Sequence, residues 1–397
     1  MAKKKILFFS TLNPFPFWAG SENLWYDFVL DPRVNNYFSI TVVLADSPIT
    51  REKAEALTKA GITVIFFKHF NTHFVDRNIY RIKDRISKRN VRTYPWYNQI
   101  IREKYDLVWF TVSTHGDLAE MSYATELCKK THTRYWLLLQ HGYEDFFINS
   151  EDELEKISNV VSGAKKIFFI ADRNRLSLER AIGKKIENSF RLVNAIPAAK
   201  ILQARSLAEK HPAGSSDKVR FFNLGRFAPK DKAQHLILEA FKDSHWNDRD
   251  WELSFIGVSG FGKWYLEKLV HYYGLPSHRI KMFNHTNDVF EKIVENDVLL
   301  MPSLSEGTPF AMLESMACGR PVLGTPVGGI PEIIVDQKTG WLSRTVDIVD
   351  IQIKLEEAWK AKGRWKQMGE EAMSFIEHFY NQEFSNILLK DYLIEDA

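Results

Sequence analysis

The sequence has little of what marks secreted, metal-binding, membrane-spanning or nucleic-acid-binding proteins. It contains two cysteines, Cys128 and Cys318, which stand far apart and without metal-ligand spacing. This argues against a disulfide framework and a zinc site. No stretch approaches the roughly 20 apolar residues of a membrane span. The net charge is only +3, too weak to favour nucleic acid as a partner. We therefore expect a cytoplasmic protein with reduced, buried cysteines and no metal.

The chain has the length and hydrophobic content of a two-domain protein. Its 397 residues, 45% of them hydrophobic, suit two domains of about 200 residues each. Short apolar runs alternate with helix-length segments, which is typical of parallel sheets covered by helices. The first series of expected strands is Ile6–Phe9, Ile40–Leu44, Val64–Phe67, Leu107–Thr111, Tyr135–Gln140 and Lys166–Ile170. The second series is Val219–Leu224, Glu252–Ile256, Ile280–Phe283, Val298–Pro302 and Pro321–Gly324. The clearest expected helices are Gln234–Phe241, Lys263–Tyr273 and Phe310–Cys318.

Two such series predict an α/β protein with two Rossmann-like, doubly wound domains. We expect the first domain at residues 1–195 and the second at 219–376. The intervening residues 196–218 contain Pro197, Pro212 and Gly214, a composition typical of a linker.

The densest chemical signal follows the expected strand that ends near Pro302. Glu306 would lie at the carboxyl end of this strand, where open α/β sheets bind ligands. The helix expected from Phe310 onward would direct free N–H groups and its positive end toward a phosphate or a sugar hydroxyl. Glu314 lies about one turn into that helix, and a carboxylate can accept hydrogen bonds from both hydroxyls of a diol. Taken singly, either Glu is more simply a solvated charge on a helix.

A second signal lies at the end of the strand Val219–Leu224. Gly225 makes a turn, and Arg226 and Lys232 follow before the next helix. A guanidinium and an ammonium at this place would suit a diphosphate. A solvated basic loop is the alternative for this pair taken alone.

Together the two signals resemble the retaining glycosyltransferases of family 4, the glycosyl transferases group 1, which have the GT-B fold. The resemblance rests on the family's E-x7-E spacing and on its G-R-x5-K pattern. Further matches lie downstream of Glu314 and in the loop after the first expected strand. The matching segments are Glu306 with Glu314, Gly225-Arg226 with Lys232, Gly319–Val322, Gly328–Glu332, and Pro16 with Gly20–Glu22.

This resemblance implies roles for named residues. Glu306 would bind the hydroxyls of a donor sugar and Glu314 those of the ribose. Arg226 and Lys232 would neutralise the leaving diphosphate. The donor site would also include Gly20, Gly225, His141 and the run Gly307, Thr308, Pro309, Phe310 and Ala311. We count Arg226, Lys232, Glu306 and His141 as the expected catalytic residues, and we expect no cofactor besides a nucleotide-diphosphate sugar as substrate.

The GT-B resemblance also implies a central cleft between the domains, and a C-terminal helix, residues 377–397, that crosses back to the first domain. Three positions depart from the family pattern. Ala233 stands where a glycine usually follows the Lys, Ala19 replaces the first glycine of the usual pair, and Pro309 removes one backbone donor beside Glu306.

The acceptor would lie against the first domain, with His115, Arg81 and Arg85 as candidate contacts. Residues Lys68–Lys104 carry ten Lys or Arg and three acids, with apolar residues at helical spacing between them. A packed surface helix explains the apolar stripe. The excess charge would suit an anionic acceptor or a peripheral contact with the inner face of a membrane.

The sequence thus predicts a metal-independent, retaining hexosyltransferase that acts on a glycan or lipid-linked acceptor, in polysaccharide or glycoconjugate synthesis. Two alternatives stay open: a non-catalytic relative that binds sugar nucleotides or glycans, and another GT-B enzyme such as a phosphorylase or epimerase. The manganese motif of a different glycosyltransferase fold, D-x-D, occurs at Asp248–Asp250. It precedes a strand and is expected at the edge away from the ligands.

Overall fold

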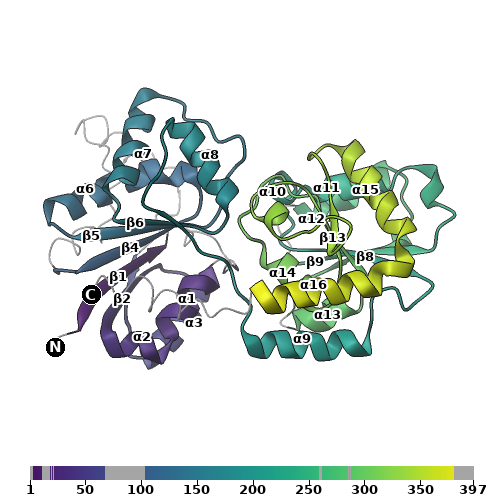
Figure 1. The fold of residues 1–397 in the computed structure, drawn as a ribbon, viewed down its shortest axis with the longest axis horizontal. Helices are drawn as coiled ribbons and strands as arrows, with labels where there is room; N and C mark the ends of the chain where they lie inside the picture. Colours follow the sequence, from purple (N-terminus) through teal and green to yellow (C-terminus); the bar gives the residue numbers. More distant parts are fainter. Residues whose placement is uncertain are drawn as a thin grey trace.

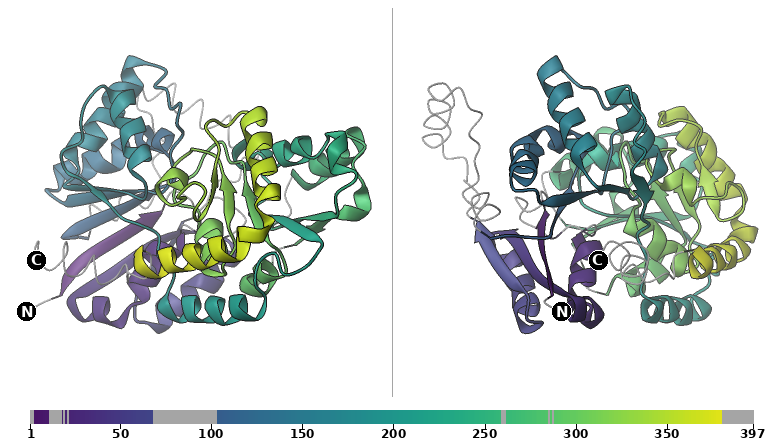
Figure 2. Two further views of the ribbon diagram at one scale, coloured as in Figure 1. Left: turned by 45° about the vertical axis from the view of Figure 1, so that its right-hand side comes forward. Right: turned by 60° about the vertical axis from the view of Figure 1, so that its left-hand side comes forward.

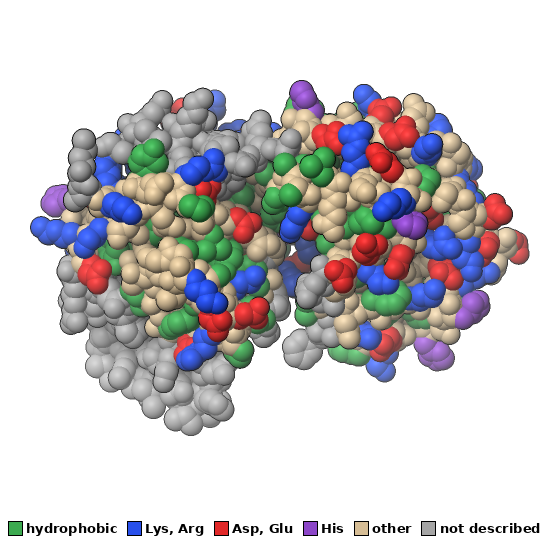
Figure 3. All heavy atoms as spheres, turned by 90° about the horizontal axis from the view of Figure 1, so that it is seen from below, with side chains coloured by type: hydrophobic (Ala, Val, Ile, Leu, Met, Phe, Trp, Pro, Cys, Tyr) green, Lys and Arg blue, Asp and Glu red, His purple; other side chains and the backbone are tan. Residues whose placement is uncertain are grey.

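The computed structural model describes residues 3–10, 18, 20, 22–67, 103–258, 262–284, 286 and 288–379. These residues form two α/β domains that lie side by side, each with a central sheet between layers of helices (Figures 1 and 2). On the face seen in Figure 3, the surface is hollowed between the two lobes.

The first domain contains a seven-stranded parallel sheet with the strand order β3-β2-β1-β4-β5-β6-β7. Its strands are β1 (Lys4–Ser10), β2 (Phe38–Ala45), β3 (Thr63–Phe67), β4 (Leu107–Val112), β5 (Arg134–Leu139), β6 (Lys166–Phe169) and β7 (Ser189–Arg191). Its helices are α1 (Glu22–Leu30), α2 (Pro32–Tyr37), α3 (Pro48–Lys59), η1 (His115–Met121), α6 (Ser122–Lys130), α7 (Glu151–Gly163) and α8 (Asp172–Ile182).

The second domain contains a six-stranded parallel sheet with the order β10-β9-β8-β11-β12-β13. Its strands are β8 (Val219–Leu224), β9 (Trp251–Ile256), β10 (Ile280–Phe283), β11 (Val298–Met301), β12 (Val322–Gly324) and β13 (Gly340–Leu342). Its α-helices are α9 (Ala198–Lys210), α10 (Pro229–Lys232), α11 (Gln234–Ala240), α12 (Gly262–Tyr272), α13 (Val289–Val294), α14 (Phe310–Ala317), α15 (Ile348–Lys360) and α16 (Trp365–Phe379). Four short 3-10 helices complete it: η2 (Ser244–Trp246), η3 (Ser277–Arg279), η4 (Ile330–Glu332) and η5 (Lys362–Arg364).

Both strand orders reverse direction once, between β1 and β4 in the first sheet and between β8 and β11 in the second. The predicted fold class, two doubly wound parallel sheets, is therefore confirmed. In sheets of this kind the crevice for ligands opens at the reversal, outside the carboxyl ends of the strands. The reversal points thus mark where a site should be sought.

Apolar strands explain why each sheet is covered on both faces. All six residues of β4 are buried, and apolar clusters lie on either side of each sheet. Aromatic rings fill much of the first core: Trp109 stacks on Phe8 and Phe168 with centroids 5.2 and 5.6 Å apart. Cys128 and Cys318 are free and buried, as predicted.

Each predicted strand is present, with its ends within two residues of the prediction. The strands β7 and β13 were not predicted. Each has three residues and lies at a sheet edge. Three residues are too few to show an apolar pattern.

The expected linker, residues 196–218, is not an extended connection. Residues Ala198–Lys210 form α9, and its buried Ile201 and Ala204 join the core of the second domain. Pro197 precedes a helix here instead of breaking one.

The last described helix, α16, packs on α14 of the second domain (Figure 1). Its residues 377–379 belong to the C-terminal helix that was expected to cross to the first domain. Residues 380–397 lie outside the described residues.

Candidate donor-binding site

The candidate site lies at the strand reversal of the second sheet. Strand β8 ends at Leu224 and is followed by Gly225, whose φ of 151° disfavours any side chain. The neighbouring loop after β9 passes so close that a Cβ on Gly257 would lie 1.8 Å from the Gly225 carbonyl oxygen. The backbone here is therefore compact, and it delivers Arg226 to the carboxyl edge of the sheet.

An ion pair joins the two predicted motifs. Lys232 Nζ lies 2.6 Å from Glu306 Oε1, and Ser303 Oγ donates to the same oxygen at 2.7 Å. The Glu306 side chain is 5% exposed, so this charge is removed from water and held in one orientation. Neither of these contacts uses Oε2, which remains for a ligand.

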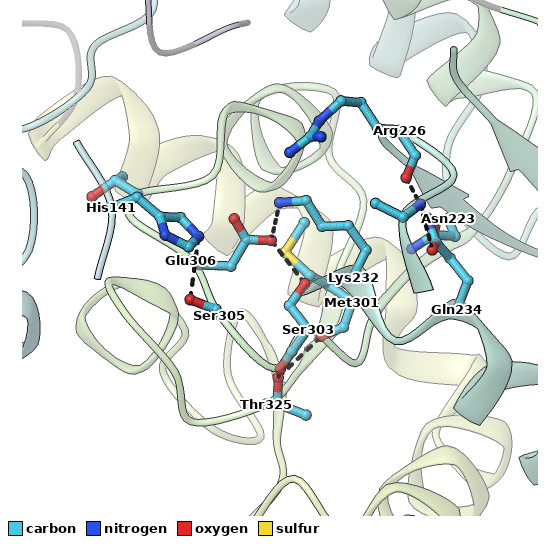
Figure 4. A network of polar contacts seen from close by, with 12 residues as sticks. His141, Asn223, Arg226, Lys232, Gln234, Met301, Ser303, Ser305, Glu306 and Thr325 are labelled. Carbon is cyan, nitrogen blue, oxygen red and sulfur yellow. Dashed lines mark hydrogen bonds and ion pairs between the residues drawn. The ribbon is translucent and has the colours of Figure 1, made fainter. Parts of the chain in front are cut away.

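Figure 4 shows how these side chains lie. The Arg226 guanidinium and the Lys232 ammonium point toward the same space, with Glu306 and His141 on its other side. The backbone of Arg226 is fixed through its carbonyl oxygen, which accepts a hydrogen bond of 2.6 Å from Gln234 Nε2. Two cations from the segment after β8 and one carboxylate from the loop after β11 thus converge at one place.

Ala233 occupies the place where the family pattern has glycine. Its φ of 48° is left-handed, and its side chain is fully buried. For a residue with a Cβ this conformation costs roughly 1–2 kcal/mol. This strained residue lies directly beside Lys232 in the chain.

The second carboxylate of the motif, Glu314, lies on α14. Burial raises its pKa to about 7, and the nearby Lys200 opposes this rise. The N-terminus of α14 has no side-chain cap, so its N–H groups are suited to an anion. Gly20 of the first domain faces this end, and a Cβ there would lie 3.5 Å from the Phe310 ring. Gly20 and Phe310 are thus brought together from opposite domains.

His141 reaches the site from the loop after β5 in the first domain. Its Nε2 lies 3.3 Å from Ser305 Oγ. Burial is the main cause that lowers the pKa of His141, although Glu306 acts in the opposite direction. The lowered pKa favours the neutral imidazole, which can both donate and accept a hydrogen bond.

Main-chain contacts join the two domains beside these side chains. Gly142 forms an antiparallel β-bridge with Glu306, and Thr308 Oγ1 donates to the Ile170 carbonyl oxygen at 2.5 Å. A Cβ on Gly307 would lie 2.1 Å from the Gln140 carbonyl oxygen. Gly307 was predicted to contact the donor, and in the structure its backbone lies against that of the first domain.

The acceptor predictions fare differently. His115 is 0% exposed and lies behind Gly142, and burial lowers its pKa to about 3. It therefore does not line an acceptor surface, and that expectation was wrong because the strand end it follows is covered by the loop after β5. Arg81 and Arg85, with the rest of 68–102, lie outside the described residues.

Sequence reasoning missed two polar residues of the site. Ser303 orients Glu306, and its own carbonyl oxygen accepts from Thr325 Oγ1 at 2.5 Å. Glu22, only 3% exposed, lies behind the Gly20 turn with a pKa raised to about 7 by burial. Serines after a strand are too common to indicate a site. Glu22 enters the sequence analysis only as part of the match at Gly20–Glu22.

Neither a metal site nor a membrane span is found among the described residues. No group of three or more His, Cys, Asp or Glu in them could hold a metal ion. The Asp248–Asp250 segment directly precedes β9, at the amino edge of the sheet as expected, and its Arg249 pairs with Glu356 at 2.6 Å. No helix within the same described ranges is long and apolar enough to cross a bilayer.

The strand orders and the motif loops between two Rossmann-like domains define a protein of the GT-B class. Residues 207–375 match the family model described as Glycosyl transferases group 1. This match falls on the second domain, where the motif residues Arg226, Lys232, Glu306 and Glu314 lie.

The chain is similar to known relatives over part of its sequence and to solved structures in fold. The chain is 32% identical over 105 residues to N-acetyl-alpha-D-glucosaminyl L-malate synthase of Bacillus anthracis, an alignment covering 26% of this chain and 28% of that protein. In fold it is similar to sucrose-phosphate synthase of Thermosynechococcus elongatus, with a TM-score of 0.73, 14% identity and full coverage of both chains. It is also similar to Anabaena HepE in complex with UDP and glucose, with a TM-score of 0.69, 15% identity, and coverage of 97% and 99%.

Proposed function

We propose that this protein is a glycosyltransferase that moves a sugar from a nucleotide-diphosphate sugar to an acceptor. The observation that carries the proposal is the convergence of Arg226, Lys232, Glu306 and His141 at the reversal of the second sheet. Cations, a buried carboxylate and a neutral imidazole in one place match the two halves of such a donor, a diphosphate and a sugar.

The charges suggest how the reaction proceeds. Breaking the bond between the anomeric carbon and the diphosphate oxygen places negative charge on the leaving group, whose stabilisation is the largest electrostatic task. Arg226, Lys232 and the N-terminus of α14 supply positive charge and N–H donors for it. Lys232 already neutralises Glu306 at 2.6 Å, so an arriving phosphate would share this cation with the carboxylate.

The sugar would be held by Glu306 Oε2 and His141, and the ribose by Glu314. The resemblance to family 4 implies retention of the anomeric configuration without a carboxylate nucleophile. We therefore propose a retaining reaction, independent of metal, in which the departing phosphate accepts the proton of the acceptor.

The donor base, the sugar and the acceptor define the finer part of the proposal. A UDP-sugar is the first donor to test, since HepE binds UDP and glucose. For the acceptor we propose a glycan or a lipid-linked glycan, in polysaccharide or glycoconjugate synthesis and at the cytoplasmic face of a membrane. The basic residues 68–104 would attract such an anionic partner.

A screen of UDP-, GDP- and ADP-sugars by thermal shift tests donor binding directly. A ligand at 100 times its dissociation constant should stabilise the protein by roughly 2.7 kcal/mol. Release of free nucleoside diphosphate without free sugar phosphate would distinguish a transferase from a phosphorylase or epimerase. Binding without turnover toward any acceptor would favour the non-catalytic alternative.

Two substitutions then test the assigned roles. Arg226→Ala and Lys232→Ala should each lower kcat by about 100-fold or more, since one such contact can supply several kcal/mol to the transition state. Lys242→Ala is the matched control, because Lys242 pairs with Glu239 on the surface. Near-normal activity in both site variants would refute the diphosphate assignment.

A further inference from the structure

The start of α8 in the first domain is capped by the second domain. Ala171, its N-cap residue, offers no side-chain hydrogen bond to the helix. Instead the Arg173 backbone N–H donates to Glu332 Oε1 at 3.2 Å, and Arg191 pairs with Glu332 Oε2 at 2.8 Å. A carboxylate at a helix N-terminus is favourable, and here the chain obtains it across the domain boundary.

A second carboxylate makes the reverse connection. Glu144 of the first domain accepts the Gly328 N–H of the second at 3.0 Å. The same carboxylate accepts hydrogen bonds from Arg173 Nε at 3.0 Å and from Arg173 Nη2 at 2.9 Å. Arg173 is thus held at its side chain by Glu144 and at its backbone by Glu332, so the two contacts share one residue.

These contacts stand beside the loop that carries the donor carboxylate. A Cβ on Gly328 would lie 2.1 Å from the Glu306 carbonyl oxygen, so whatever fixes Gly328 also fixes the backbone at Glu306. The other side of that backbone is the β-bridge to Gly142, two residues before Glu144. The loop from His141 to Glu144 and the loop around Glu306 are therefore aligned together.

We propose that Glu144 and Glu332 are positioning residues. Each carboxylate contacts the other domain, and together they hold the loop around Glu306, here called the donor loop, in the position that binds the donor. We name this pair the carboxylate latch. The proposal rests on the proposed function. It adds that this pair determines which fraction of the molecules can bind the donor. Neither carboxylate touches the donor; each acts through the backbone of the loops that do.

The latch predicts a particular kinetic signature. If it sets the closed population, its loss lowers the competent fraction and raises the apparent dissociation constant of the donor by the same factor. Saturating donor selects the closed form again, so kcat should change little. Damage to the chemistry itself would instead lower kcat.

The variants are Glu144→Gln and Glu332→Gln, alone and together, and each keeps the side-chain shape while removing the charge. Because these ion pairs are partly exposed, with side chains 30% and 16% exposed for Glu144 and Glu332, we expect each variant to raise the donor KM by about 3- to 10-fold. The double variant should exceed either single one, with kcat within about 2-fold of wild type. Glu356→Gln is the matched control, because it breaks a bidentate pair with Arg249 inside one domain.

A readout without turnover separates this proposal from the proposed function. Small-angle scattering of the substrate-free double variant should give a larger radius of gyration than wild type and Glu356→Gln. An unchanged radius together with an unchanged donor KM would overturn the latch. A larger radius in a protein that turns over no nucleotide sugar would instead sustain the latch and refute the proposed function. Folding of every variant is checked by its thermal unfolding midpoint.

Discussion

Glu22 makes the stability of the first domain depend on pH. Glu22 is 3% exposed, and burial raises the pKa of its carboxyl from 4.5 to about 7, although the neighbouring polar groups of Ser10, Trp25 and Gln140 oppose the rise. Between these two values the folded protein keeps a proton that the unfolded chain has released. The free energy of unfolding therefore falls as the pH rises through this window, the reverse of the usual behaviour of a salt-bridged carboxylate.

The magnitude follows from the two pKa values. Each pH unit in the window costs about 1.4 kcal/mol, so the total loss approaches about 3 kcal/mol once Glu22 is ionised in both states. Glu22→Gln places a neutral, similarly shaped side chain at the same position. The variant should match wild type near pH 5 and exceed it by about 2–3 kcal/mol near pH 8.

Urea unfolding of wild type and variant at several pH values measures this difference. Subtracting the two curves removes titrations that they share, including that of Glu314, whose pKa is also raised by burial. Glu55→Gln on the exposed face of α3 serves as the surface control. A difference between wild type and Glu22→Gln that stays constant from pH 5 to pH 8 would refute the reasoning.

Three further predictions concern the site and its surroundings. Activity should survive EDTA, since cations of the chain face the proposed diphosphate; loss of activity that manganese restores would contradict this. Gly307→Ala should raise the donor KM with each domain still folded, because the new Cβ would lie 2.1 Å from the Gln140 carbonyl oxygen of the other domain; an unchanged KM would show that the domains need not approach so closely. Reversing Arg81, Arg85 and Arg89 to Glu should raise the acceptor KM and spare donor binding, and salt should weaken the wild-type effect. Unchanged acceptor kinetics and vesicle binding would reduce that segment to a solvated helix face.

Much of the fold could be predicted from the sequence because buried parallel strands consist of short apolar runs. The six apolar or neutral residues of β4, all buried, show how direct this signal is. The edge strand β7 gives no such signal, since two of its three residues are only partly buried and the third, Arg191, is exposed. The helix α9 was hidden for a different reason: Pro197 and Pro212 flank it, and a proline before a helix looks the same as a proline in a linker.

The candidate site was predictable where a motif joins chemistry to strand ends. Arg226, Lys232 and Glu306 each follow a strand of one sheet, so topology alone brings them together. Contacts between domains leave no such trace. Nothing in the sequence relates Glu144 to Gly328, 184 residues apart, or indicates that His115 would be covered by the loop after β5.

The donor loop can be understood as a segment that serves both domains at once. Its Glu306 side chain faces the proposed donor, while the first domain holds the loop at Gly142, Ile170 and Asn194. Gly142 bridges to Glu306, the Ile170 carbonyl oxygen accepts from the Thr308 side chain, and Asn194 Nδ2 donates to the Thr308 carbonyl oxygen at 2.6 Å. A residue such as Gly307 is then constrained twice, by the ligand on one side and by the neighbouring domain on the other. The glycine that follows Glu306 need not therefore mark a phosphate contact. Close approach of the two domains is a sufficient physical reason for it, and it ties the position of the donor carboxylate to the closure of the molecule.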